Sequence, residues 1–138
     1  MQTAELVNLC IGRLKEKVTK LAIEEFPDDV RSYSLTHSVG AMLVRYIGSG
    51  YEQQKINNFV LEKRTARIEV VCVARTLMKS EGMYSIIDQC KSALRGYAPD
   101  GKNKIRVAAD GYRDMDESVW VYSVTFNVAV LEHENSGG

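Results

Sequence analysis

Hydrophobic residues recur every three or four positions in two parts of the chain, which is the spacing of one face of an α-helix. The first part covers residues 3–26, and Pro27 ends it because proline disfavours helix in the preceding residue. The second part covers residues 81–95, between Ser80 as a cap and Gly96 as a stop. We therefore predict two amphipathic helices.

Most of the remaining hydrophobic residues alternate with polar ones or form short apolar runs, as in β-strands. In the last of these segments, Trp120, Tyr122 and Phe126 share one face with several valines. Valines on the same face favour a packed core face over an aromatic platform for stacking bases. The predicted strands cover residues 30–35, 39–47, 67–77, 104–109 and 119–131.

A polar segment at residues 51–65 interrupts this series of strands. It follows Gly48, Ser49 and Gly50, which we expect to break the preceding strand, and it has no strong hydrophobic period. We predict a long excursion from the sheet, part of which can be a hairpin. Long loops are uncommon in compact domains and often carry function.

The order helix, strands, helix, strands predicts an α+β fold. We expect a mainly antiparallel β-sheet with two main α-helices packed on one face. The 138 residues suit a single domain, which we place at residues 1–132, and the polar residues 133–138 suggest a flexible C-terminal tail.

Charge and composition exclude several classes of protein. Eighteen basic and eighteen acidic residues give a net charge of zero, whereas nucleic-acid binders carry excess Lys and Arg. The longest apolar runs, residues 40–44 and 70–74, are too short to cross a membrane. Three widely spaced cysteines fit neither a disulfide scaffold nor a CxxC metal site and indicate reduced thiols.

Two segments resemble ligand-binding motifs without meeting their requirements. Residues 96–103 approach the phosphate loop GxxxxGK[ST], but Asn103 replaces the hydroxyl residue and a predicted helix precedes the segment. A helix stop followed by a turn explains it better. The second segment is a group of four acidic residues that lacks the regular spacing of a calcium loop and indicates a solvated turn. These residues are Asp110, Asp114, Asp116 and Glu117.

No nucleophile stands beside a base in the sequence. His37 and His133 lie near strand ends, away from the cysteines, and Cys10, Cys72 and Cys90 fall on predicted apolar faces. We therefore predict no catalytic residue, no metal and no cofactor, and a protein that is not an enzyme.

Several segments together resemble the tail terminator family of Mu-like contractile-tailed bacteriophages and prophages. The likeness covers most of residues 5–131 and includes the first helix with its Phe26-Pro27 end. The other matching segments are residues 40–49 (GAMLVRYIGS), 74–77 (ARTL), 82–88 (GMYSIID), 93–97 (ALRGY) and 119–122 (VWVY), followed by Phe126.

The resemblance implies a function in virion assembly. Members of that family form a hexameric ring on the head-proximal end of the tail, stop tail tube polymerisation and provide the head-joining surface. It implies a homo-oligomer whose partners are the tail tube protein and, next to it, sheath and head-completion proteins. The expected location is the virion tail, after assembly in the cytoplasm of the bacterial host, without membrane or sequence-specific nucleic acid.

A ring requires two different surfaces that meet between neighbouring copies. The excursion at residues 48–66 and a sheet edge are the candidates, and we expect Tyr51, Lys55, Lys63 and Arg64 to make intersubunit or tube contacts. An ordinary solvated loop is the alternative interpretation of these four residues. For the whole chain, the alternatives are a small cytoplasmic enzyme and a nucleic-acid-binding module of α+β fold.

Overall fold

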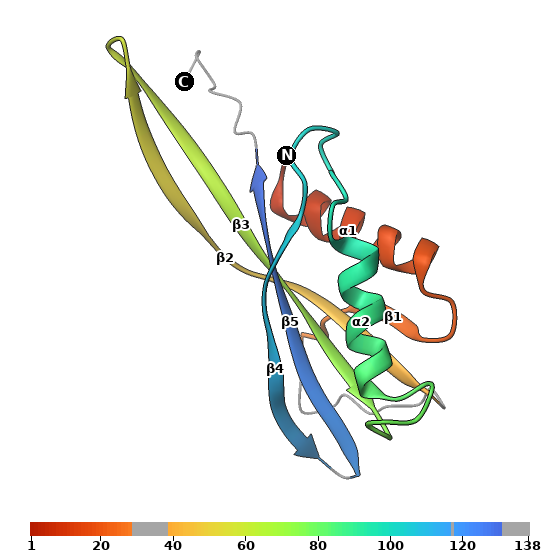
Figure 1. Ribbon diagram of the computed structural model, residues 1–138. Helices are drawn as coiled ribbons and strands as arrows, with labels where there is room; N and C mark the ends of the chain where they lie inside the picture. Colours follow the sequence, from red (N-terminus) through yellow and green to blue (C-terminus); the bar gives the residue numbers. More distant parts are fainter. Residues whose placement is uncertain (29–38, 117, 131–138) are drawn as a thin grey trace.

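The computed structural model describes residues 1–28, 39–116 and 118–130 (Figure 1). The predicted strand at 30–35, the predicted tail at 133–138, both histidines and Glu117 lie outside the described residues. Helix α1 spans Thr3–Lys17 and α2 spans Met83–Leu94. The described strands are β1 (Ala22–Glu25), β2 (Gly40–Ile56), β3 (Phe59–Ala74), β4 (Arg106–Asp116) and β5 (Val119–Val130).

The described strands form one sheet in the order β1-β2-β3-β5-β4. β1 pairs with β2 in parallel, and the other three pairs are antiparallel. Both helices lie on the same side of this sheet (Figure 1). The predicted α+β class, with a mainly antiparallel sheet and two helices on one face, is confirmed.

The main core lies between the helices and one face of the sheet. Leu6 and Leu14 of α1 and Ile86 of α2 are almost completely buried there, together with Phe126 of β5. The predicted packed face of the last strand is therefore confirmed. Trp120 and Tyr122, at the other end of the same face, are partly buried against this core.

The first helix is shorter than the hydrophobic spacing predicts. α1 ends at Lys17, and Val18 has an extended backbone with φ −118° and ψ 118°. Val18 and Thr19 are β-branched residues, which favour extended backbone. The chain then forms β1, where Ile23 enters the core and pairs with Met42 of β2. The predicted helix at residues 18–26 is wrong, because apolar spacing alone did not reveal this parallel pairing.

The predicted strand break at residues 48–50 and the predicted acidic turn from Asp110 are also wrong, because β2 and β4 continue through these positions with β-bulges in the neighbouring ladder. β2 continues through Gly48 and Gly50, with a register shift between Tyr46 and Gly48. β4 continues through Asp110 and Gly111, with register shifts on either side. A bulge adds one residue to a strand without ending the pairing, so local glycine content does not distinguish it from a turn.

The second helix begins two residues later than predicted and has no side-chain cap. Its N-cap is Gly82, whereas we predicted a cap at Ser80. Carbonyl groups of the preceding loop replace the cap: the Met83 N–H donates to Thr76 O at 2.7 Å and the Tyr84 N–H to Leu77 O at 3.1 Å. A Cβ atom at position 82 would lie 2.5 Å from the Leu77 oxygen, so glycine allows this close approach.

Candidate assembly surfaces

The most exposed part of the sheet is a two-stranded extension that we call the arm, residues 51–63. The described part of β5 pairs with β3 as far as Arg64, opposite Val130. β2 and β3 continue to pair with each other beyond that point, from Glu52 opposite Lys63 to Ile56 opposite Phe59. Figure 1 shows this extension projecting away from both helices. The predicted excursion is thus a continuation of two sheet strands.

A two-residue turn closes the arm. Asn57 and Asn58 have φ values of 48° and 68°, so both have left-handed backbone conformations. Two consecutive positive φ values characterise the type I′ turn, whose twist matches that of a hairpin. Asparagine tolerates this conformation better than most residues that have a side chain. The Asn57-Asn58 pair was therefore the local signal for a hairpin.

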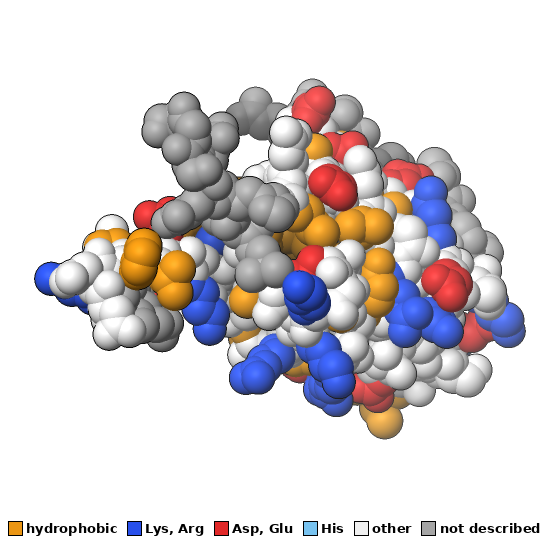
Figure 2. Space-filling model, turned by 90° about the horizontal axis from the view of Figure 1, so that it is seen from above, with side chains coloured by type: hydrophobic (Ala, Val, Ile, Leu, Met, Phe, Trp, Pro, Cys, Tyr) orange, Lys and Arg blue, Asp and Glu red, His pale blue; other side chains and the backbone are white. Residues whose placement is uncertain are grey.

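The arm exposes an unusual amount of apolar surface for a polar segment. Phe59 is 72% exposed, Val60 50% and Leu61 47%, and these residues follow the turn directly. Tyr51, at the other end of the arm, is also exposed. Seen from above, hydrophobic side chains lie together on the projecting arm (Figure 2). Exposed apolar clusters of this kind mark interaction sites.

The structure separates the four predicted contact residues into two groups. Tyr51, Lys55 and Lys63 are exposed on the arm. Arg64 is only 6% exposed and lies at the base of the arm. Its guanidinium donates to Ser49 Oγ at 3.0 Å and to Thr3 Oγ1 at 2.9 Å. Arg64 therefore ties β3 to β2 and to the start of α1.

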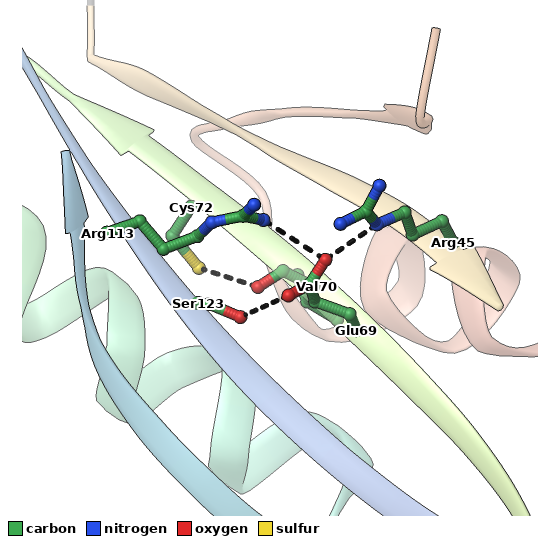
Figure 3. Close-up of polar contacts among 6 residues, drawn as sticks. All are labelled: Arg45, Glu69, Val70, Cys72, Arg113 and Ser123. Carbon is green, nitrogen blue, oxygen red and sulfur yellow. Dashed lines mark hydrogen bonds and ion pairs between the residues drawn. The ribbon is translucent and has the colours of Figure 1, made fainter. Parts of the chain in front are cut away.

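A polar cluster lies on the sheet face opposite the helices (Figure 3). The Glu69 carboxylate accepts from Arg45 Nε at 2.6 Å, from Arg113 Nη1 at 3.2 Å and from Ser123 Oγ at 2.7 Å. Burial alone would raise the pKa of Glu69, but the bonds from Ser123 and Arg45 and both arginine charges hold that pKa below its ordinary value of 4.5. The cluster joins β2, β3, β4 and β5 through one carboxylate.

A concave site of about 550 Å³, which we call the notch, lies where β1 ends. Its walls come from the first turns of α1, from the chain after β1 and from β2. The lining residues are Ala4, Val7, Asn8, Glu25, Phe26, Pro27, Asp28, Val44, Arg45 and Tyr46. The walls therefore combine apolar side chains with two exposed acidic residues, Glu25 and Asp28.

Aromatic side chains form a separate cluster where β4 and β5 meet the start of α2. The Tyr112 ring packs edge-on against Tyr122 and Trp120, at centroid distances of 5.7 and 6.3 Å, and Tyr84 packs against Tyr122 at 6.4 Å. Tyr112 and Met115 are exposed. We call these residues the aromatic patch: Tyr84, Tyr112, Met115, Trp120 and Tyr122.

The three cysteines are buried and free. Burial raises the pKa of the Cys10 thiol to about 12, and a hydrogen bond with Cys72 together with burial raises that of Cys90 well above its ordinary value. Neutral thiols in such surroundings are poor nucleophiles. Within the described residues, no three His, Cys, Asp or Glu side chains are arranged to hold a metal ion.

The segment that resembles a phosphate loop is a turn closed by Asp100. Gly96 ends α2 with φ +81°, a left-handed conformation that favours glycine. Asp100 Oδ1 accepts from the backbone N–H groups of Lys102 at 2.8 Å and Asn103 at 2.7 Å. A carboxylate of the chain thus holds amides that a phosphate would need, which confirms the interpretation as a turn.

A comparison with protein families assigns the chain to a family. The family described as Gp37 protein matches residues 10–136, which is nearly the whole chain. The chain belongs to this family. The Gp37 protein family is phage-associated, which agrees with the phage or prophage origin that the resemblance in the sequence implies. No curated protein sequence matches the chain. Neither described helix is long and apolar enough to span a membrane.

Sequence reasoning missed three features of this phage-family protein. The Glu69 cluster requires residues from four strands, and only the acidic residue inside an apolar strand hinted at it. The notch depends on where β1 ends, and the prediction had assigned β1 to a helix. The exposed apolar run at residues 59–61 was visible in the sequence, but the surrounding polar residues hid its significance.

Proposed function

We propose that this chain is a phage or prophage tail terminator, a structural protein without enzymatic activity. Its subunits form a ring on the head-proximal end of the tail, stop tube polymerisation and present the surface that joins the head. Membership of a phage-associated family and the resemblance in the sequence support this proposal. The arm is the structural observation that carries it.

The arm supports a function in assembly because it is expected to be only marginally stable in an isolated subunit. A two-stranded hairpin is marginally stable in water, and additional packing is normally needed to stabilise it. Here the hairpin also exposes Phe59, Val60 and Leu61 at its end. Contact with another protein would bury this surface and stabilise the hairpin. A ring-forming subunit provides such contacts at every position.

The proposed ring stops growth of the tail tube because the ring is closed and covers the end of the tube. A heterologous interface that closes leaves every copy paired with two neighbours. A closed ring bound to the tube end would then cover the sites where the next tube subunits add. The tail tube protein is the proposed direct partner, and sheath and head-completion proteins would bind nearby. The zero net charge suits contacts with proteins more than with nucleic acid.

Sizing and electron microscopy of the purified protein, alone and with growing tail tubes, test this function. The wild-type chain is expected to form closed rings and to bind at one end of each tube. Tubes that grow to the same length with and without the protein would contradict the proposal.

The three exposed predicted contact residues provide variants for this assay. Tyr51→Ala, Lys55→Glu and Lys63→Glu are expected to weaken ring or tube binding while the free energy of unfolding stays within about 0.5 kcal/mol of wild type. Arg64→Glu does not test assembly cleanly, because Arg64 holds the base of the arm through Ser49 and Thr3. Unchanged capping by all three exposed variants would remove these residues from the contact surface.

A further inference from the structure

The end of the arm and the notch are complementary in form and in apolar character. The arm ends in three consecutive exposed apolar residues, Phe59, Val60 and Leu61. The notch is concave, and its walls include the edge of the buried Val7 and the partly buried Phe26 ring, over which the Arg45 guanidinium lies at 4.5 Å. Its volume of about 550 Å³ leaves space for a large apolar side chain.

The charges beside these two surfaces are also complementary. Lys55 lies on the arm directly opposite Val60, so a cation accompanies the apolar end. Glu25 and Asp28 lie at the notch with exposed side chains. Among the described lining residues the one cation is Arg45, which shares the Glu69 carboxylate with Arg113, whereas Glu25 and Asp28 have no ion pair among the described contacts. The notch therefore presents acidic groups to an incoming lysine.

An arm cannot reach the notch of its own subunit. Arg45 in the notch and Lys55 on the arm belong to the same strand, β2. Ten residues of extended strand separate them by about 33 Å, because each residue advances roughly 3.3 Å. β3 runs beside β2 along the whole arm and keeps it extended. An arm that occupies the notch must therefore belong to another copy.

We propose that the end of the arm of one subunit docks in the notch of the next. This inference rests on the proposed ring and identifies the two surfaces that close it. Because the arm and the notch are different surfaces, the contact is heterologous and repeats from head to tail around the assembly. The apolar end supplies the anchor, and Lys55 near Glu25 and Asp28 fixes the orientation.

The aromatic patch is the other apolar surface that an arm could contact. Its rings pack edge-on against one another at centroid distances of 5.7 to 6.4 Å, but Tyr84, Tyr112 and Met115 are each about half exposed, so the charges decide between the patch and the notch. The acidic residues that flank the patch in β4 already have partners within the subunit: Asp110 pairs with Lys91 at 2.9 Å, and Asp114 accepts the Met115 N–H at 2.7 Å. The notch is therefore the better acceptor, and the experiment below distinguishes the two.

Two defective variants test the proposal by complementation. Phe59→Asp/Leu61→Asp places charges on the end of the arm and leaves the notch intact. Asn8→Trp fills the notch from the exposed face of α1 and leaves the arm intact. Each variant alone is expected to remain monomeric, with an intersubunit affinity reduced about a hundredfold or more, as for the loss of interface anchors.

An equimolar mixture of the two variants should form one-to-one dimers. Each such dimer contains one intact arm in one intact notch, and its free ends cannot propagate. Light scattering coupled to gel filtration measures the mass directly. Gln53→Asp on the arm and Glu16→Trp on α1 are matched controls outside the proposed contact, and both should form wild-type assemblies. Circular dichroism verifies that every variant is folded.

Rings formed by Asn8→Trp alone, or a mixture that stays monomeric, would overturn the arm-in-notch contact. If Tyr112→Asp in the aromatic patch abolished the rings instead, that patch would be the acceptor. Each of these results is compatible with a wild-type ring that caps tubes, so the proposed function would stand. A wild-type chain that neither self-associates nor binds tubes would contradict the function and the contact together.

A charge exchange gives a second, independent test. Lys55→Glu and Glu25→Lys/Asp28→Lys should each weaken self-association, by about two- to fivefold for each lost surface ion pair. Combining all three substitutions in one chain should restore most of the affinity. A combined variant weaker than either parent would show that these charges do not meet.

Discussion

Strand β3 passes through two different environments while keeping one partner, β2. Its residues 66–74 lie in the body of the sheet, where most side chains are buried and Val70 is completely buried. Its residues 59–63 lie in the arm, where every side chain is exposed and Phe59 is 72% exposed. The body has β5 and two helices beside this strand, and the described arm has neither. Neighbouring elements, more than strand pairing, therefore determine the stability of each half.

The largest difference should appear between Phe126 in the body and Phe59 in the arm. Phe126→Ala removes a completely buried ring and should lower the free energy of unfolding by about 3–5 kcal/mol. Phe59→Ala should change it by less than about 0.5 kcal/mol, because the ring is mostly in solvent. Urea denaturation of monomeric protein measures both. Equal losses would mean that the arm packs against the body of its own subunit.

Glu69 in the body and Glu62 in the arm give the same comparison for polar side chains. Glu69→Gln removes the charge that binds Arg45, Arg113 and Ser123 and should lower the free energy of unfolding by about 1.5–3 kcal/mol. The matched control is Glu62→Gln in the arm, where the side chain is exposed and the expected change is within about 0.5 kcal/mol. Similar effects of the two variants in urea denaturation would show that the cluster contributes no more than a surface charge.

The pH dependence of stability should follow the sign of the Glu69 shift. The pKa of Glu69 is held below its ordinary value of 4.5 in the folded protein, so the unfolded chain takes up the proton first as pH falls. The stabilisation is fully present above pH 4.5 and is lost as pH falls through the folded pKa. Stability curves of wild type and Glu69→Gln should therefore converge at low pH. Curves that stay parallel would assign the shift to another group.

The fold class could be predicted from the sequence because it depends on the hydrophobic periods and on the order of the elements. Errors in the bounds of single elements do not change either. The spacing of Ile86 and Cys90 identified α2, and the alternation through Phe126 identified β5. β1 could not be predicted in the same way. Its four residues are too few to establish a period, and a parallel pairing with β2 stabilises it. Tertiary contacts at this point override the helical spacing of the preceding residues.

The candidate surfaces were harder to predict than the elements. Polarity identified the segment that contains Tyr51, Lys55 and Lys63, because long polar stretches are usually exposed. The same rule grouped Arg64 with them, although Arg64 is buried. Its environment depends on Ser49 and Thr3, which approach only in the folded protein. A buried arginine that has two hydroxyl partners looks like an exposed one in the sequence.

A smaller effect than those of Phe126→Ala and Glu69→Gln is expected at the turn of the arm. Asn58 has φ 68°, and alanine should cost about 1–2 kcal/mol in this conformation, whereas glycine adopts it easily. Asn58→Ala should increase amide hydrogen exchange in residues 51–63 and leave exchange in the core strands unchanged, because the arm can open without the body. Asn58→Gly is the control that should preserve protection. Faster exchange throughout β3 in Asn58→Ala would show that arm and body unfold as one unit, and the contrast between the two halves of this strand would then be one of exposure alone.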